Sequence, residues 1–305
     1  MFVEEYLQDV RRQHFVPRAL VVYARRVAAH ARADMLANPS AVRSIWTVAL
    51  AYFAAAFGAA VALALAWHDR DLAERFLLQT SLWMLSAFAF ITLFVGLLRD
   101  ARGYRLSGLN LPLTLTLMRV ALVPGISLFL VDRHLALALG IYLVAALSDV
   151  VDGLIARRWN QTTPLGTILD PLVDIVFNLA MLAGLAAAEL LPAWVFWVAV
   201  VRYSLLVVGA ACLYLFVGPV RIRPTSFGRL TGVVMTALIA LYTLCVAVQG
   251  PLGAGLTRLT AVALGVLLSA TIIQVLALGW YNLRVLTGAA RQADHVAGDV
   301  RWGRR

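Results

Sequence analysis

The chain has 305 residues, of which 62% are hydrophobic and 14% are charged, and its mean hydropathy is +0.84. These values exclude a water-soluble globular protein with an ordinary core and indicate a polytopic membrane protein. The net charge of +10 comes from 26 arginines, without any lysine. Because the arginines gather at the ends of apolar segments, the charge favours anionic lipid headgroups over nucleic acid as the partner.

Eight mostly apolar runs are each long enough to cross a hydrocarbon layer of about 30 Å. They lie at residues 45–67, 76–98, 111–131, 135–156, 166–189, 192–217, 228–249 and 259–281. We therefore predict an all-α polytopic bundle of about eight transmembrane helices. Before the first run, PRALVVYARRVAAHARADMLANP (17–39) mixes arginines with aliphatic residues at helical spacing. This pattern fits either an interfacial helix or a solvated juxtamembrane helix.

The positions of the arginines predict the orientation of the chain. If both termini are cytoplasmic, 20 of the 26 arginines fall in inside segments and four fall outside. The remaining two, Arg119 and Arg202, lie within spans. Since short cytoplasmic loops are enriched in arginine, we expect both termini and the active site to face the cytoplasm, with the protein in a bacterial inner membrane.

Four aspartates gather in DVVDGLIARRWNQTTPLGTILDPLVD, residues 149–174. At about 100° per residue, one helix face carries the first cluster, which comprises Asp149, Asp152, Gly153, Ala156 and Arg157. The second cluster repeats every four residues on the next helix and comprises Gly166, Asp170 and Asp174. A polar turn with a proline separates the two clusters and reverses the chain. The four carboxylates are therefore expected to converge.

Four carboxylates that converge inside a membrane require compensating cations, because each ionised group is costly there. Oxygen ligands without nearby histidine or cysteine favour Mg²⁺ or Mn²⁺, and four aspartates can hold two such ions. A pair of ions stabilises both the attacking and the leaving oxygen of a phosphoryl displacement. The small residues on the same helix faces would leave room for a phosphate-bearing ligand.

The pattern D-x2-D-G-x2-A-R-x8-G-x3-D-x3-D resembles the signature of the CDP-alcohol phosphatidyltransferases at every fixed position. LPLTLTLMRVALVP (111–124) is also similar to the first span of that family. On this basis we divide the chain into a cytoplasmic segment with an interfacial helix (1–44), two additional spans (45–107), the family core (108–283) and a basic cytoplasmic tail (284–305).

The resemblance implies transfer of a phosphatidyl group from CDP-diacylglycerol to an alcohol, with release of CMP. It implies that Asp149, Asp152 and Asp170 are metal ligands and that Asp174 is the general base, which also contacts metal. It further implies a homodimer. The residues expected at the nucleotide donor are Asp152, Gly153, Ala156, Arg157, Gly166, Thr116 and Arg119.

The acceptor is expected to be a small polar, phosphorylated alcohol, with glycerol 3-phosphate as the best candidate. VRIRPTSFGRLTG (220–232) resembles a loop of the phosphatidylglycerophosphate synthase and cardiolipin synthase branches. The residues expected to bind the acceptor are Arg202, Arg221, Arg223 and Arg229. Three positions depart from the family pattern: Leu113 stands in place of asparagine, Tyr203 in place of an acidic residue and Arg229 in place of lysine.

Two other functions fit parts of the sequence. Intramembrane prenyltransferases also use aspartates with Mg²⁺, but their aspartate motifs lie on helices far apart in the sequence. A divalent-cation transporter also uses acidic helix faces, although it needs neither the Gly-Ala-Arg set nor an arginine-rich loop.

Overall fold

The computed structural model describes residues 2–13, 15–100, 102–159, 161–216, 226–248 and 251–302. Within these ranges, side chains are described except at 2–5, 226–229, 251–253 and 285–302. The helices are α1 (Phe2–Arg12), α2 (Pro17–Ala37), α3 (Pro39–Trp67), α4 (Arg70–Leu93), η1 (Val95–Leu97), α5 (Leu111–Val131), α6 (Leu135–Arg158), α7 (Pro164–Ala187), α8 (Ala193–Phe216), α9 (Ser226–Ala247) and α10 (Pro251–Trp302).

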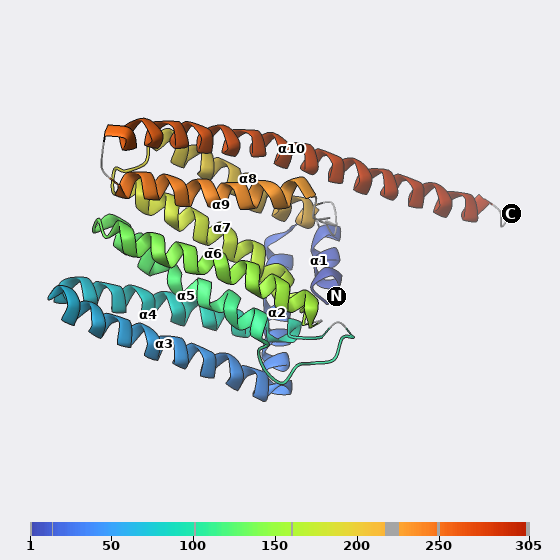
Figure 1. Ribbon diagram of the computed structural model, residues 1–305. Helices are drawn as coiled ribbons and strands as arrows, with labels where there is room; N and C mark the ends of the chain where they lie inside the picture. The colour runs from blue at the N-terminus through green and yellow to red at the C-terminus, as the bar shows by residue number, and fades with distance from the viewer. Residues whose placement is uncertain are drawn as a thin grey trace.

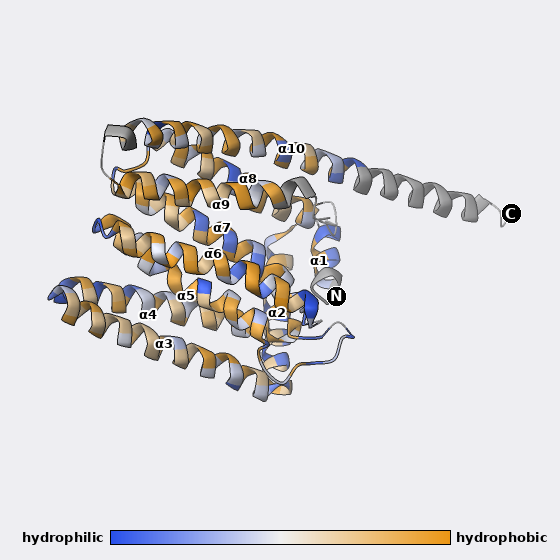
Figure 2. Cartoon of the chain, viewed as in Figure 1, coloured by the Kyte–Doolittle hydropathy of each residue, from blue (hydrophilic) through white to orange (hydrophobic). Residues whose placement is uncertain are grey.

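In the described part of the chain, eight helices, α3 to α10, are long and apolar enough to cross a membrane. They run side by side in one bundle, and hydrophobic residues cover most of their length (Figures 1 and 2). Large apolar side chains such as Leu50, Leu65 and Ile273 are exposed on the outside of this bundle, where lipid would surround them. The prediction of an all-α membrane bundle with about eight spans is confirmed.

Helix α5 is the most buried of the eight described spans and packs against both α6 and α7. It lies close against α7 at Gly184. An added Cβ there would lie 2.7 Å from Leu130 Cδ1 and 3.2 Å from Ser127 Cα, so a larger residue would push the two helices apart. On the far side of this centre, α10 packs against α8 and α9 and then continues beyond the bundle (Figure 1).

The two additional spans, α3 and α4, attach to α5 through an apolar cluster and two side-chain hydrogen bonds. Tyr52 Oη donates to the Thr114 carbonyl at 2.7 Å, and Trp83 Nε1 donates to the Val120 carbonyl at 2.8 Å. Pro124 has no N–H, so it leaves the Val120 carbonyl without its usual helical donor. Trp83 therefore supplies the hydrogen bond that Pro124 removes.

Helix α2 crosses the end of the bundle at which α5 and α7 begin (Figure 1). It is held there by buried Asp34, whose carboxylate accepts a hydrogen bond from Arg105 at 2.8 Å. Gly96 lies directly against this carboxylate, where there is no space for a Cβ. The other faces of α2 expose apolar side chains such as Leu20 and Val21. Its position at the membrane surface stays a prediction.

Candidate functional site

The turn between α6 and α7 sets the relative position of the two aspartate clusters. Thr163 begins α7 as its N-cap, and its hydroxyl accepts the Gly166 N–H at 3.0 Å. Asn110 caps α5 by accepting the Leu113 N–H at 3.2 Å, and its Nδ2 donates to the Gln161 carbonyl at 2.6 Å. One side chain therefore joins the start of α5 to the turn between the aspartate helices.

The four aspartates lie on α6 and α7 and converge on α5, as the helical periodicity predicted. Asp152 is buried, with a side chain that is 6% exposed, whereas the side chains of Asp149 and Asp174 are 45% and 47% exposed. The cluster thus has a buried inner carboxylate and two outer carboxylates that solvent reaches.

Arg119 of α5 occupies the centre of the cluster, and its side chain is only 2% exposed. Its Nη1 lies 2.6 Å from both Asp149 Oδ1 and Asp174 Oδ1. Its Nη2 lies 2.8 Å from Asp152 Oδ2. The depth of Arg119 in its span predicted a share in this site, and the ion pairs place it there. A buried arginine of this kind is stable only because carboxylates surround it.

Thr116 lies one helical turn before Arg119 and connects Asp170, the remaining aspartate, to the cluster. Its hydroxyl oxygen is 2.9 Å from Asp170 Oδ1 and 3.4 Å from Asp152 Oδ2. The same oxygen is 3.1 Å from the Pro112 carbonyl, so its single proton has three competing acceptors. Thr116 and Arg119 together bring all four carboxylates into one connected network.

The donor set of this network fits a hard divalent ion, since it consists of carboxylates and a hydroxyl. The geometry is different from that of a preformed metal site. Among the residues that the structure describes, no three His, Cys, Asp or Glu side chains are grouped so that they could hold an ion. The Arg119 guanidinium lies between the carboxylates instead.

The other residues expected at the donor surround the cluster on α6 and α7. Arg157 is exposed, and its guanidinium folds back over Gly153, where an added Cβ would lie 3.3 Å from Nη1. Ala156 is half-buried next to it. Gly166 is half-buried at the start of α7, where an added Cβ would lie 3.2 Å from the Thr163 hydroxyl. The space above Gly153 is therefore taken by the Arg157 guanidinium, whereas Ala156 and Gly166 add no large side chain.

Arg202 of α8 lies deeper in the bundle than the aspartates and has a different environment. Its Nε donates to Thr271 Oγ1 at 2.7 Å, and its guanidinium lies 4.6 Å from the centre of the Tyr203 ring. Its buried Nη1 makes no hydrogen bond, and no described carboxylate forms an ion pair with it. Arg202 is therefore a half-buried cation that forms no ion pair with a carboxylate in the described part of the chain.

The remaining acceptor residues cannot be placed. Arg221 and Arg223 lie outside the described residues, and Arg229 lies on α9, where its side chain is not described. Their proposed role stays a prediction.

Sequence reasoning missed a second polar layer below the aspartates. Tyr142 Oη donates to Asn178 Oδ1 at 2.7 Å, and Asn178 Nδ2 donates to the Asp174 carbonyl at 2.9 Å. Tyr203 is 4% exposed, its hydroxyl makes no well-formed hydrogen bond, and its ring lies against the Arg202 guanidinium. Asn178 lies four residues after Asp174, so continuing the four-residue repeat of α7 would have found it.

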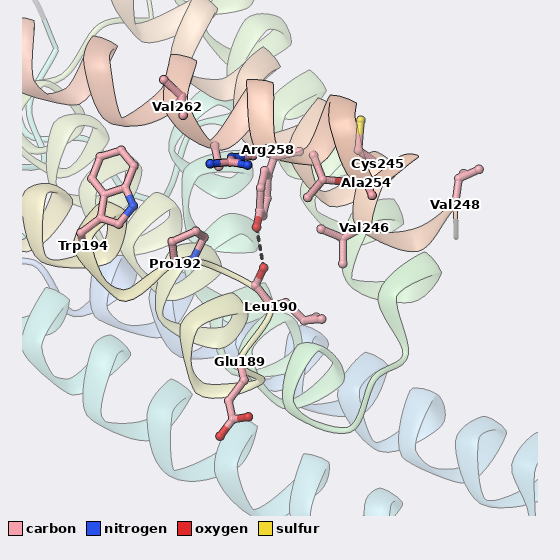
Figure 3. Close-up of a pocket in the computed structure, with 13 residues that line it drawn as sticks. Glu189, Leu190, Pro192, Trp194, Cys245, Val246, Val248, Ala254, Arg258 and Val262 are labelled. Carbon is pink, nitrogen blue, oxygen red and sulfur yellow. Dashed lines mark hydrogen bonds between the residues drawn. The ribbon is translucent and has the colours of Figure 1, made fainter. Parts of the chain in front are cut away.

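A cavity of about 710 Å³ lies at the opposite end of the bundle, between the α7–α8 turn and the adjoining ends of α9 and α10 (Figure 3). Its wall is mostly apolar, with Trp194 and Arg258 at its edge. Tyr242 Oη donates to the Leu190 carbonyl across it, as the dashed line in Figure 3 shows. Among its described lining residues, Glu189 is the only carboxylate.

The fold and the site define a polytopic membrane protein with a buried arginine–aspartate centre near one end of its helices. The sequence profile of the CDP-alcohol phosphatidyltransferase family matches residues 109–288. The chain therefore belongs to this family, which favours phosphatidyl transfer over the prenyltransferase and transporter alternatives. No solved structure matches the chain.

Curated relatives match shorter segments of the chain. It is 36% identical to human cardiolipin synthase (CMP-forming) over 84 residues, which cover 27% of this chain and 28% of the human protein. It is 42% identical to the Streptomyces coelicolor cardiolipin synthase over 71 residues, covering 23% and 33% of the two chains. It is 33% identical to CDP-diacylglycerol–glycerol-3-phosphate 3-phosphatidyltransferase of Aquifex aeolicus over 125 residues, covering 40% and 69%. The chain thus spans about a third of the length of these two cardiolipin synthases.

Proposed function

We propose that this protein transfers a phosphatidyl group from CDP-diacylglycerol to a phosphate-bearing alcohol and releases CMP. The observation that carries the proposal is the convergence of all four motif aspartates around Arg119 between α5, α6 and α7. The family assignment and the names of the relatives support the same chemistry.

Asp149, Asp152, Asp170 and Asp174 would hold the two divalent ions, Mg²⁺ or Mn²⁺, that the family implies. When bound, such ions would offset the charge of the donor diphosphate and stabilise the charge that develops on the leaving CMP. The carboxylate oxygens suit these ions, and Thr116 would orient Asp170 through the 2.9 Å contact.

The transfer step requires a base for the acceptor hydroxyl. Asp174 would accept the proton as the hydroxyl oxygen forms a bond to the phosphorus that carries diacylglycerol. The bond from this phosphorus to the CMP oxygen breaks, and CMP leaves with the electron pair. Asp174 suits this role because it is half-exposed at the edge of the cluster, whereas Asp152 is enclosed.

The donor would bind along the α6 face beside the cluster. Arg157 would pair with the nucleotide phosphates, and the small side chains at Gly153, Ala156 and Gly166 would allow the nucleotide to approach the helices. The donor's lipid tails would remain in the surrounding bilayer.

The environment of Arg202 favours an anionic acceptor. Residue 202 lies 14 residues before the end of α8 and Asp174 lies 10 residues after the start of α7, so Arg202 is about 6 Å deeper at 1.5 Å per residue. A short phosphorylated alcohol could bind its phosphate at Arg202 and present its hydroxyl to Asp174. Glycerol 3-phosphate is our first candidate, with Arg221, Arg223 and Arg229 guiding its entry. Phosphatidylglycerol shares the required chemistry.

We also propose that the site faces the cytoplasm of a bacterial inner membrane, because most arginines lie at that end of the bundle. Residues 1–44 and 284–305 would then be cytoplasmic, and 45–107 would add two spans to the family core. A homodimer is proposed from the family resemblance.

The test uses purified full-length protein with CDP-diacylglycerol, Mn²⁺ or Mg²⁺ and a panel of acceptors that includes glycerol 3-phosphate, phosphatidylglycerol, inositol phosphate and serine. We expect CMP release with glycerol 3-phosphate and none in EDTA. Asp174→Asn should retain donor binding and lose transfer, whereas Glu189→Gln at the opposite end should change neither. Undiminished CMP release in EDTA, or by the Asp174→Asn variant, would refute the proposed mechanism.

A further inference from the structure

Arg119 holds oxygen atoms that the proposed metal ions also require. Its Nη1 contacts one oxygen of Asp149 and one of Asp174, so these two oxygens are at most twice 2.6 Å apart. A Mg²⁺ ion binds its ligands at about 2.0–2.1 Å, which leaves no space for the guanidinium between the same two oxygens. Arg119 and a metal ion therefore compete for this position.

The contacts of Arg119 divide into an outer and an inner set. The outer set joins Nη1 to Asp149 and Asp174, whose side chains are nearly half exposed. The inner set joins Nη2 to Asp152, which is enclosed. Ions arriving from solvent reach the outer aspartates first, so the outer contacts can be exchanged while the inner contact anchors the side chain.

The charges of the cluster favour such an exchange. With all four aspartates ionised, one arginine leaves about three negative charges uncompensated in this cluster. In addition, Arg119 Nε is buried and makes no hydrogen bond in this arrangement. The guanidinium thus has a donor available for an anion, and once Nη1 leaves the outer aspartates it has two.

We infer that Arg119 is an exchangeable counter-ion: it occupies the aspartate cluster when metal is absent, and when metal binds it transfers its outer contacts to the donor diphosphate. The inference rests on the proposed function, because it assumes metal and donor at this site. It adds a coupling that the motif alone does not contain. Metal binding and donor binding would each favour the other through the position of one side chain.

The experiment compares wild-type protein with Arg119→Gln and Arg119→Lys in detergent, using binding and stability as readouts. Mn²⁺ binding is measured by electron paramagnetic resonance, CMP binding by calorimetry with and without Mn²⁺, and unfolding by a thermal scan. Arg75→Gln is the matched control, because Arg75 also pairs with two carboxylates, Asp71 and Asp132, at the opposite end of the bundle.

We expect Arg119→Gln to bind Mn²⁺ about tenfold more tightly, because the ion no longer has to displace the guanidinium from the two outer aspartates. Its Tm should fall in EDTA and recover in Mn²⁺, since the ions replace the missing charge. The factor by which Mn²⁺ raises the affinity for CMP should be at least tenfold smaller in this variant than in wild type. Arg119→Lys should bind Mn²⁺ with intermediate affinity, and Arg75→Gln should lower Tm without changing Mn²⁺ affinity.

Unchanged or weaker Mn²⁺ binding by both Arg119 variants would overturn the inference and make Arg119 a fixed structural support. If Mn²⁺ raised the affinity for CMP by the same factor in the Arg119 variants as in wild type, that result alone would also overturn the inference. Failure of the proposed function would give a different result: wild-type protein would release no CMP with any acceptor. The Mn²⁺ affinities of wild type and the Arg119 variants could still be compared in that case.

Discussion

The Tyr203 hydroxyl gives a sharp test of the acceptor site. It is buried, makes no well-formed hydrogen bond and belongs to the residue whose ring lies against the Arg202 guanidinium. In the free protein, Tyr203→Phe removes a buried hydroxyl that makes no well-formed hydrogen bond, so stability should stay the same or rise by up to about 1 kcal/mol. With acceptor bound, the variant lacks a hydrogen bond worth about 0.5–1.5 kcal/mol. We expect the acceptor KM to rise about two- to tenfold.

Tyr142→Phe on α6 is the matched control. Its hydroxyl donates to Asn178 at 2.7 Å, so its loss leaves the Asn178 oxygen without this partner and should cost about 1 kcal/mol of stability. The assay combines thermal unfolding with CMP release at varied glycerol 3-phosphate and fixed donor. A less stable Tyr203→Phe with unchanged acceptor KM would refute the reasoning, because the hydroxyl would then have an internal partner and no ligand.

Three other predictions concern the scaffold and its orientation. Asn110→Ala should lower stability by about 1–3 kcal/mol in thermal unfolding, whereas Asn110→Asp keeps the oxygen that caps α5 and should lose less. Equal losses in the two variants would show that the cap does not contribute to stability. Gly184→Ala should destabilise the protein by about 1–3 kcal/mol, because the added Cβ would lie 2.7 Å from Leu130. An unchanged Tm would show that α5 and α7 can move apart without cost. In a cysteine-free background, Trp159→Cys should react with an impermeant thiol reagent from the cytoplasmic side and Glu189→Cys from the other, and the reverse result would invert the topology.

The sequence was sufficient to predict the spans and the convergence of the aspartates, because both follow from local periodicity. Hydropathy placed α5 at residues 111–131, as the structure has it. The 100° spacing brought Asp149 and Asp152 to one face and Asp170 and Asp174 to another. These features need only the geometry of single helices.

Contacts between distant segments were beyond this reasoning. The depth of Arg119 suggested a share in the site, but nothing local to residue 119 indicates that its guanidinium bridges aspartates on two other helices. Likewise, Trp83 donates to the carbonyl that Pro124 leaves free, although the two residues lie on different spans. Leu113 stands where the family pattern has asparagine, and the structure explains this departure. Leu113 is buried in the apolar cluster, and Asn110, three residues earlier, supplies the helix cap.

The two arginines within the spans lead to opposite requirements for ligands. Arg119 has three carboxylates in contact and a fourth nearby, so its surroundings carry excess negative charge and attract cations. Arg202 has a threonine and an aromatic ring, so it carries an uncompensated positive charge and attracts an anion. The bundle therefore contains two charged centres of opposite sign. In the proposed reaction, the aspartates would attract the divalent ions that offset the donor diphosphate, whereas Arg202 would attract the acceptor phosphate directly, so both centres are needed.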